Sequence, residues 1–298
     1  MAYDEFGLFQ ENAEEAGLPW SGSPAVRRTS VEVEPGRALS ALVWGTSPAD
    51  LVLLHGGAQN AHTWDTVALA LERPLVALDL PGHGHSDHRD DGPFGPVENA
   101  GDVAVVLPTL APEARMVVGM SLGGLTAIAL GARRPELVRK LALVDVTPGV
   151  DRDKAAPIAA FIAGPESFDS FDEILARTIE FNPTRTVSSL RRGVLHNAVE
   201  RPDGRWVWRY QRPGIAESAE IGDNMPDFGV LWDDVSKLDM PLMLVRGADS
   251  GVVGDEDVAE FRRRRPAVRV ETVEAAGHSI QGDQPVELAR LLADFLEA

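Results

Sequence analysis

Residues 115–135 read RMVVGMSLGGLTAIALGARRP and carry the strongest signal for the architecture of this chain. The first part, RMVVGMS at 115–121, is a short apolar run of the kind that forms a buried strand, and LGGLTAIALGARRP continues as an apolar helix. Between the two, residues 119–123 match the pattern G-x-S-x-G. A serine on such a strained turn is lifted clear of the sheet, and the flanking glycines leave room for neighbouring backbone. The segment therefore predicts a nucleophile, Ser121.

Strands and helices alternate on both sides of this segment. Two strands are expected around the turn EPGR within 27–45, and the helix that reads VENAGDVAVVLPTL is expected to be interrupted near Pro108. Alternating units with fully apolar strands indicate a parallel sheet covered by helices on both faces. The further buried strands of that sheet are expected at 49–57, 74–84, 140–148, 241–250 and 268–278.

The strand–helix rhythm stops in one long region, which indicates an insertion over the strand ends. The expected organisation is an N-terminal tail at 1–26, a core α/β domain at 27–148 and 236–298, and a lid at 149–235. Within the lid, RPDGRWVWRY predicts a hairpin that turns at Asp203-Gly204 and places Trp206, Trp208 and Tyr210 on one face.

A serine nucleophile needs a base, and a base needs an acid that holds its tautomer. His278, in AAGHS after the last strand, is the best candidate for the base. Asp249, in RGADS at the end of the preceding strand, is the preferred acid, and Asp145, in LVDVTP, is the alternative acid. The order Ser121, Asp249, His278 matches a known chain order of such triads.

The developing oxyanion and the substrate also need contacts. The amide of Leu122 lies at the start of the expected helix, where N–H groups favour an anion. Gly57, after His55-Gly56, is the expected second oxyanion donor, with Ala58 next. The candidates for residues that line the substrate pocket are Ala58, Met120, Trp206 and Trp208.

A second motif competes with the serine site. Residues 83–88 read HGHSDH and match H-x-H-x-D-H, a zinc-binding pattern. Such a site needs further histidines downstream, yet there is none between His88 and His196. We therefore expect a turn after a strand here, with no catalytic metal and no organic cofactor.

The overall composition limits the partners. The chain has 298 residues, 28 basic and 46 acidic, for a net charge of −18, so nucleic acid is an unsuitable partner. It has no cysteine, which excludes disulfides and thiolate chemistry. The N-terminal residues lack the apolar core of a secretory signal, no membrane insertion is expected, and the expected location is cytoplasmic. No feature indicates an oligomeric state.

Taken in order, LVLLHGG, LDLPGHGHS, GMSLGG, LVRGADS and AAGHS closely resemble the α/β-hydrolase superfamily. The resemblance covers about 27–147 and 236–298. It implies an eight-stranded, mostly parallel sheet, a Ser-Asp-His triad and a lid that shapes the pocket. The expected reaction is cofactor-free hydrolysis of an ester-type bond in a small molecule (a carboxylic ester, lactone or thioester) through an acyl-enzyme on Ser121.

Two other functions stay open at this point. Carbon–carbon bond hydrolases and enol-lactonases of the same fold also use a serine, although Ser279 stands where a carbon–carbon hydrolase usually has an aromatic residue. A non-catalytic ligand-binding protein on a hydrolase fold is the alternative from another class, and the presence of all three triad members in order counts against it.

Overall fold

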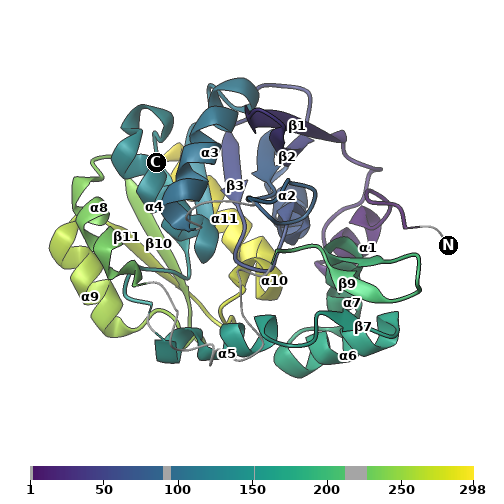
Figure 1. Ribbon diagram of the computed structural model, residues 1–298. Helices are drawn as coiled ribbons and strands as arrows, with labels where there is room; N and C mark the ends of the chain where they lie inside the picture. Colours follow the sequence, from purple (N-terminus) through teal and green to yellow (C-terminus); the bar gives the residue numbers. More distant parts are fainter. Residues whose placement is uncertain (1–2, 90–94, 151, 212–226) are drawn as a thin grey trace.

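The computed structural model describes residues 3–89, 95–150, 152–211 and 227–298. Its centre is an eight-stranded sheet of order β1-β2-β4-β3-β5-β6-β10-β11 (Figure 1). The pairs β1·β2 and β2·β4 are antiparallel and the remaining pairs are parallel. The strands are β1 (Val26–Glu34), β2 (Arg37–Trp44), β3 (Leu51–Leu54), β4 (Leu75–Leu78), β5 (Met116–Met120), β6 (Leu141–Val144), β10 (Leu242–Gly247) and β11 (Arg269–Val273).

The four central strands β3, β4, β5 and β6 are buried at every residue, as their uninterrupted apolar sequences predict. Their side chains alternate between two hydrophobic clusters, one on each face of the sheet. Leu54 and Val52 belong to one cluster, and Leu51 and Leu53 to the other. This two-sided burial confirms the predicted α/β class and the eight-stranded, mostly parallel sheet.

Helices cover both faces of the sheet. One face carries α3 (Pro96–Leu110), α4 (Leu122–Arg133), α8 (Leu231–Lys237) and α9 (Asp255–Arg264), and the other carries α1 (Phe9–Glu15), α2 (Asp65–Leu71) and α11 (Pro285–Glu297). No helix within the described ranges combines the length and apolarity that crossing a bilayer requires.

The expected break at Pro108 is wrong, because α3 continues through this residue to Leu110. Proline removes one backbone hydrogen bond and crowds the preceding turn. Pro108 lies only two residues before the end of the helix, and Val103, Val106 and Leu107 are buried in the core beside it. The packing of this apolar face outweighs the local cost of the proline.

Residues 3–25, expected from the sequence to form a tail, pack onto the core. Phe9 of α1 is buried and its ring lies 4.8 Å from the ring of Trp44. The same helix contacts α2. The N-terminal segment therefore forms part of the helical layer on one face of the sheet.

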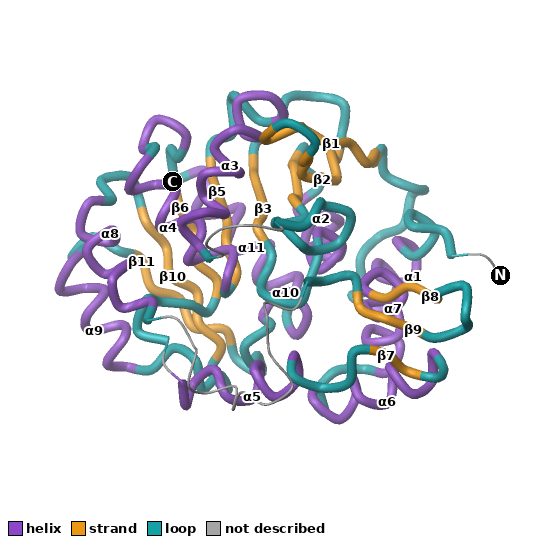
Figure 2. The backbone as a smooth tube through the Cα atoms, in the orientation of Figure 1, coloured by secondary structure: helices purple, strands orange, loops and turns teal. Residues whose placement is uncertain are grey.

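A separate group of elements follows β6 and lies along one end of the sheet (Figure 2). It contains α5 (Arg152–Ile162), β7 (Ser167–Phe168), α6 (Phe171–Phe181), α7 (Val187–Asn197), β8 (Ala198–Glu200) and β9 (Trp206–Trp208). The three strands form their own sheet of order β7-β9-β8 over a small apolar core. The antiparallel β8·β9 pair, with Gly204 at φ +83°, confirms the predicted hairpin.

The C-terminal end of the expected lid differs from the expected boundary. Residues 212–226 lie outside the described residues. The proposed boundary at 235 falls inside α8, and α8 packs against α4. Leu231 and Val235 belong to the core cluster on that face of the sheet, so α8 is placed with the core layers.

Candidate active site

Ser121 lies at a sharp turn between β5 and α4. Its backbone has φ +49° and ψ −118°, a conformation that L-residues rarely adopt. A Cβ on Gly123 would lie 2.3 Å from the carbonyl oxygen of Leu54, and one on Gly119 would lie 2.4 Å from that of Gly123. Only glycine permits this close approach of backbone, so the G-x-S-x-G pattern has a direct steric cause.

The register of the sheet brings Ser121 and Asp145 to the same edge. Met120 at the end of β5 pairs with Val144 at the end of β6, so the next residue on each strand leaves the sheet at the same level. Asp145 is fully buried and also has a positive φ, +49°. Two adjacent strands thus end in strained turns that carry a hydroxyl and a carboxylate.

His278 completes this arrangement from the loop between β11 and α10 (Ile280–Asp283). Its Nδ1 lies 2.8 Å from Oδ2 of Asp145. The carboxylate also accepts hydrogen bonds from the amide of Gly247, at 3.0 Å, and from the hydroxyl of Ser250. A buried acid held in this way fixes the ring of His278 and favours the tautomer with the proton on Nδ1, which leaves Nε2 free to act as a base.

The preference for Asp249 as the acid is wrong, because Asp145 occupies the position beside His278. Gly247 is the last residue of β10, and Asp249 lies two residues beyond it with an exposed side chain. Its backbone amide donates to the carbonyl of Ala276, which holds the turn. The RGADS segment still supports the acid, through Gly247 and Ser250 rather than through its own aspartate.

The two expected oxyanion donors are Leu122 and Gly57. Leu122 is the first residue of α4, and Gly57 lines the cavity in which Ser121 lies. A Cβ on Gly57 would meet nothing within 4 Å, so there is open space beside its Cα. The amide of Ala58, in contrast, donates to Nε2 of His83 at 3.1 Å, which removes it as a second choice for the oxyanion.

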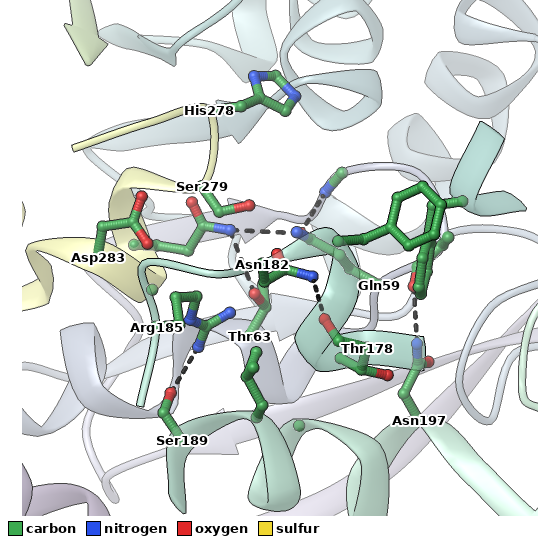
Figure 3. Close-up of a pocket in the computed structure, with 18 of the residues that line it drawn as sticks. Gln59, Thr63, Thr178, Asn182, Arg185, Ser189, Asn197, His278, Ser279 and Asp283 are labelled. Carbon is green, nitrogen blue, oxygen red and sulfur yellow. Dashed lines mark hydrogen bonds between the residues drawn. The ribbon is translucent and has the colours of Figure 1, made fainter. Parts of the chain in front are cut away.

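Ser121 and His278 face a single cavity of about 420 Å³ between the core and the lid. Loops after β3 and β11 line one side, and residues of α5, α6 and α7 line the other. Figure 3 shows His278, Ser279 and Asp283 on one side, with Thr178, Asn182 and Arg185 of the lid across from His278. A cavity of this size suits a small organic substrate.

Three of the four pocket candidates line this cavity, and one does not. Met120, Ala58 and Trp208 are lining residues. Trp206 lies on the same face of β9 as Trp208, as residues two apart in a strand do. Its ring, however, packs edge to face on Phe171, 5.1 Å away, in the small core of the lid, and does not line the cavity, so the expectation for Trp206 is corrected.

Polar residues that the sequence did not single out form much of the cavity wall. Gln281 donates to Thr63 at 3.2 Å and to Gln59 at 3.4 Å. Asn197, the last residue of α7, donates to the carbonyl of Ala58 at 2.7 Å. These bonds join the lid and the His278 side to the loop that carries Gly57.

His83 and Asp87 of the competing HGHSDH motif have protein partners. His83 donates from Nδ1 to the carbonyl of Pro81 at 2.9 Å and accepts from Ala58 at Nε2. Burial lowers the pKa of His83, which keeps the ring neutral for this role. The Asp87 carboxylate accepts from the amide of Ala38. The motif therefore serves as a structural turn that supports the loop after β3.

A buried cluster of His62, Asp65 and His196 lies beside the cavity. Their potential ligand atoms lie within 4.8 Å of one another, which raises the question of a metal. The imidazole rings are stacked, with centroids 3.8 Å apart and planes 12° apart. A metal binds an imidazole nitrogen in the plane of its ring, and one ion cannot lie in the planes of two stacked rings. The cluster fits an ion pair instead.

The charge in this cluster resides on His62. Burial opposes its protonation, but Asp65, which binds Nδ1 at 2.9 Å, and Glu5 together raise its pKa to about 9. The Arg28 guanidinium, 3.3 Å from Nε2, acts in the opposite direction and is outweighed. Burial and the charge of His62 lower the pKa of His196 well below its usual value. The stack therefore holds one imidazolium and one neutral imidazole.

This assignment predicts how stability depends on pH. The folded pKa of His62 lies above the unfolded value near 6.5, so its ion pair stabilises the protein fully below pH 6.5 and is lost as pH rises toward 9. The free energy of unfolding of the wild type minus that of His62→Gln should fall by about 1–3 kcal/mol between pH 6.5 and 9. Urea denaturation across this range measures the difference. A difference that is constant or grows with pH would contradict the assignment.

The fold and the site geometry agree with the comparison to known proteins. The chain belongs to the alpha/beta hydrolase family, whose sequence model matches residues 51–291. The resemblance inferred from the sequence motifs is thereby confirmed.

Among individual proteins, the chain is 48% identical over 301 residues to Esterase Rv0045c of Mycobacterium tuberculosis, a match that covers 99% of this chain and 96% of that protein. A crystal structure of that esterase superposes with a TM-score of 0.86 at 46% identity and covers 100% of this chain and 99% of the other. The mouse sn-1-specific diacylglycerol lipase ABHD11 is 28% identical over 261 residues, 84% of this chain and 81% of its own.

Proposed function

We propose that this protein is a serine esterase in which Ser121 is the nucleophile, His278 the base and Asp145 the acid. One observation carries the proposal: a hydroxyl on a strained turn and an imidazole bound to a buried carboxylate open into the same cavity. The extensive similarity to the mycobacterial esterase supports ester cleavage over the other reactions that this fold performs.

The mechanism follows from the order of these groups. Nε2 of His278 takes the proton of the Ser121 hydroxyl as the oxygen attacks the ester carbonyl. The amides of Leu122 and Gly57 bind the oxyanion that forms. His278 gives the proton to the departing alcohol, which leaves an acyl group on Ser121. Water, deprotonated by His278, then attacks this acyl-enzyme and releases the carboxylic acid and the free serine.

The cavity supports a small-molecule ester as the substrate. Apolar side chains such as Met120, Ile158, Phe161 and Trp208 line it together with the polar groups described above. Such a mixed lining fits an ester with a short or medium acyl chain, oriented by a few hydrogen bonds. The Ser-Asp-His chemistry needs no metal or organic cofactor.

Labelling with a fluorophosphonate tests this function directly. The reagent phosphonylates a serine only when the hydroxyl is activated by its base. We expect one equivalent of label on the peptide that contains Ser121, measured by mass spectrometry, and no labelling at this position after heat denaturation. Labelling of a different serine, or none in the folded protein, would refute the assignment of the nucleophile.

A further inference from the structure

The lid places an unpaired cation in the wall of the active-site cavity. Arg185 lies in the loop between α6 and α7 and lines the cavity. Its Nη2 donates to the hydroxyl of Ser189 at 2.6 Å. Its Nε is buried without a hydrogen-bond partner, and no carboxylate in the described part of the chain lies within 4.0 Å of the guanidinium.

Arg192, the second arginine that lines the cavity, provides a comparison because its guanidinium is paired within the protein. Arg192 donates to Asn12 at 2.7 Å and to Ser188 at 2.7 Å, and it forms an ion pair with Glu15. Its charge is balanced within the protein, and its bonds join α7 to α1. Arg185 lies seven residues earlier and lacks an equivalent carboxylate among the described residues.

Leaving Arg185 without a paired anion has a cost. Burial lowers the pKa of Arg185, and the more distant carboxylates of Asp283 and Glu15 offset this only in part. Asp283, the acidic residue among those that line the cavity, accepts a hydrogen bond from the amide of Gly277 beside His278. Its carboxylate is thus held on the His278 loop and is not in ion-pair contact with the guanidinium.

The position of the guanidinium is fixed from both sides. Ser189 holds it from α7, and on the other side it packs against Gly282 of α10. A Cβ on Gly282 would lie 2.7 Å from Cζ of Arg185, so any larger residue here would displace the guanidinium from its present position. Figure 3 shows Arg185 bound to Ser189 and close to the segment that carries Asp283.

From this geometry we propose that Arg185 binds a carboxylate on the substrate, so that the preferred substrates are half-esters of dicarboxylic acids. This inference rests on the proposed esterase function. A guanidinium with free N–H donors and no paired anion binds a carboxylate through charge-assisted hydrogen bonds, often two in parallel. The substrate then supplies the counter-charge that the protein lacks at this point, while its ester group lies at Ser121.

The test compares two esters of equal chain length that differ in charge. The probes are the mono-p-nitrophenyl esters of adipic and suberic acid, and the same compounds with the free carboxylate capped as a methyl ester. We expect the wild type to show a kcat/KM at least tenfold higher for the half-ester than for its capped analogue. In Arg185→Gln this ratio should fall by about tenfold or more, mainly through KM.

Three further variants separate the effect of the charge at residue 185 from the effects of the shape and position of the guanidinium. Arg185→Lys keeps the charge but not the fork of donors and should retain part of the ratio. Gly282→Ala should lower the ratio because it displaces the guanidinium without removing it. Arg191→Gln removes an exposed arginine of α7 that pairs with Glu11, and should leave both rates unchanged. Melting temperatures establish that each variant is folded.

The possible outcomes separate failure of the carboxylate site from failure of the proposed esterase function. If the wild type cleaves both esters and Arg185→Gln leaves their ratio unchanged, the carboxylate site is refuted and the esterase stands. If neither ester is cleaved, the proposed function fails, and calorimetric binding of monomethyl adipate decides the inference alone. Binding that weakens at least tenfold in Arg185→Gln supports it, and absent or equal binding overturns it.

Discussion

Replacing Ser121 by alanine is expected to lower kcat for ester hydrolysis by about 10⁴–10⁶-fold. Alanine has no hydroxyl to form the acyl-enzyme, so only direct attack by water, assisted by the remaining groups of the site, is left. The fold should survive, because the strained turn depends on Gly119 and Gly123 and on the flanking strand and helix. The measurement is the release of p-nitrophenol from p-nitrophenyl acetate and butyrate, with thermal melting as the check on folding.

A matched control makes this result specific. Ser236, an exposed serine of α8 whose hydroxyl donates to the carbonyl of Trp232, is remote from the residues that line the cavity. Ser236→Ala should keep the wild-type rate. Full activity of a folded Ser121→Ala variant would show that the nucleophile is a different residue and would remove the basis of the proposed mechanism.

The second large effect concerns the acid. Asp145→Asn is expected to lower kcat by about 10³–10⁴-fold, because an amide beside Nδ1 of His278 no longer stabilises the imidazolium or the required tautomer. Asp249→Asn should change kcat by less than about threefold, because that side chain is exposed and away from the ring. Rates for both variants are compared at pH 8 on the same ester.

Stability measurements accompany this pair, since Asp145 also accepts hydrogen bonds from Gly247 and Ser250. Asparagine keeps one oxygen acceptor, so Asp145→Asn should remain folded with a lower melting temperature. A large loss of kcat in Asp249→Asn, with Asp145→Asn near the wild-type rate, would restore the acid that the sequence favoured.

The comparison of these two aspartates shows what a single sequence can and cannot specify. Both follow an apolar strand, and local pattern treats them alike. What separates them is the lateral order of the sheet, in which β6 lies between β5 and β10. That order depends on contacts between distant segments. The elbow around Ser121 needs no such information, because its glycines and its flanking strand and helix are adjacent in the sequence.

In the lid, too, some features follow from local sequence and others depend on contacts between distant segments. The hairpin was predicted because its turn residues and alternating aromatic residues are local signals. Which of the aromatic rings on that face meets the cavity depends on how the lid packs, so the different places of Trp206 and Trp208 do not follow from the sequence. Arg185 and His196 carry no pattern of their own, and only the packing of the lid against the core brings them to the cavity.

The chain enters the lid after Asp145 and leaves it before His278. Ser121 and Asp145 both precede the hairpin turn at 201–205, and His278 follows it. A single cut in that exposed turn would therefore yield two fragments, neither of which holds a complete set of catalytic groups. Ester cleavage by such a split protein would therefore show that the two fragments have reassembled. The activity of the cleaved protein would measure how strongly its fragments associate.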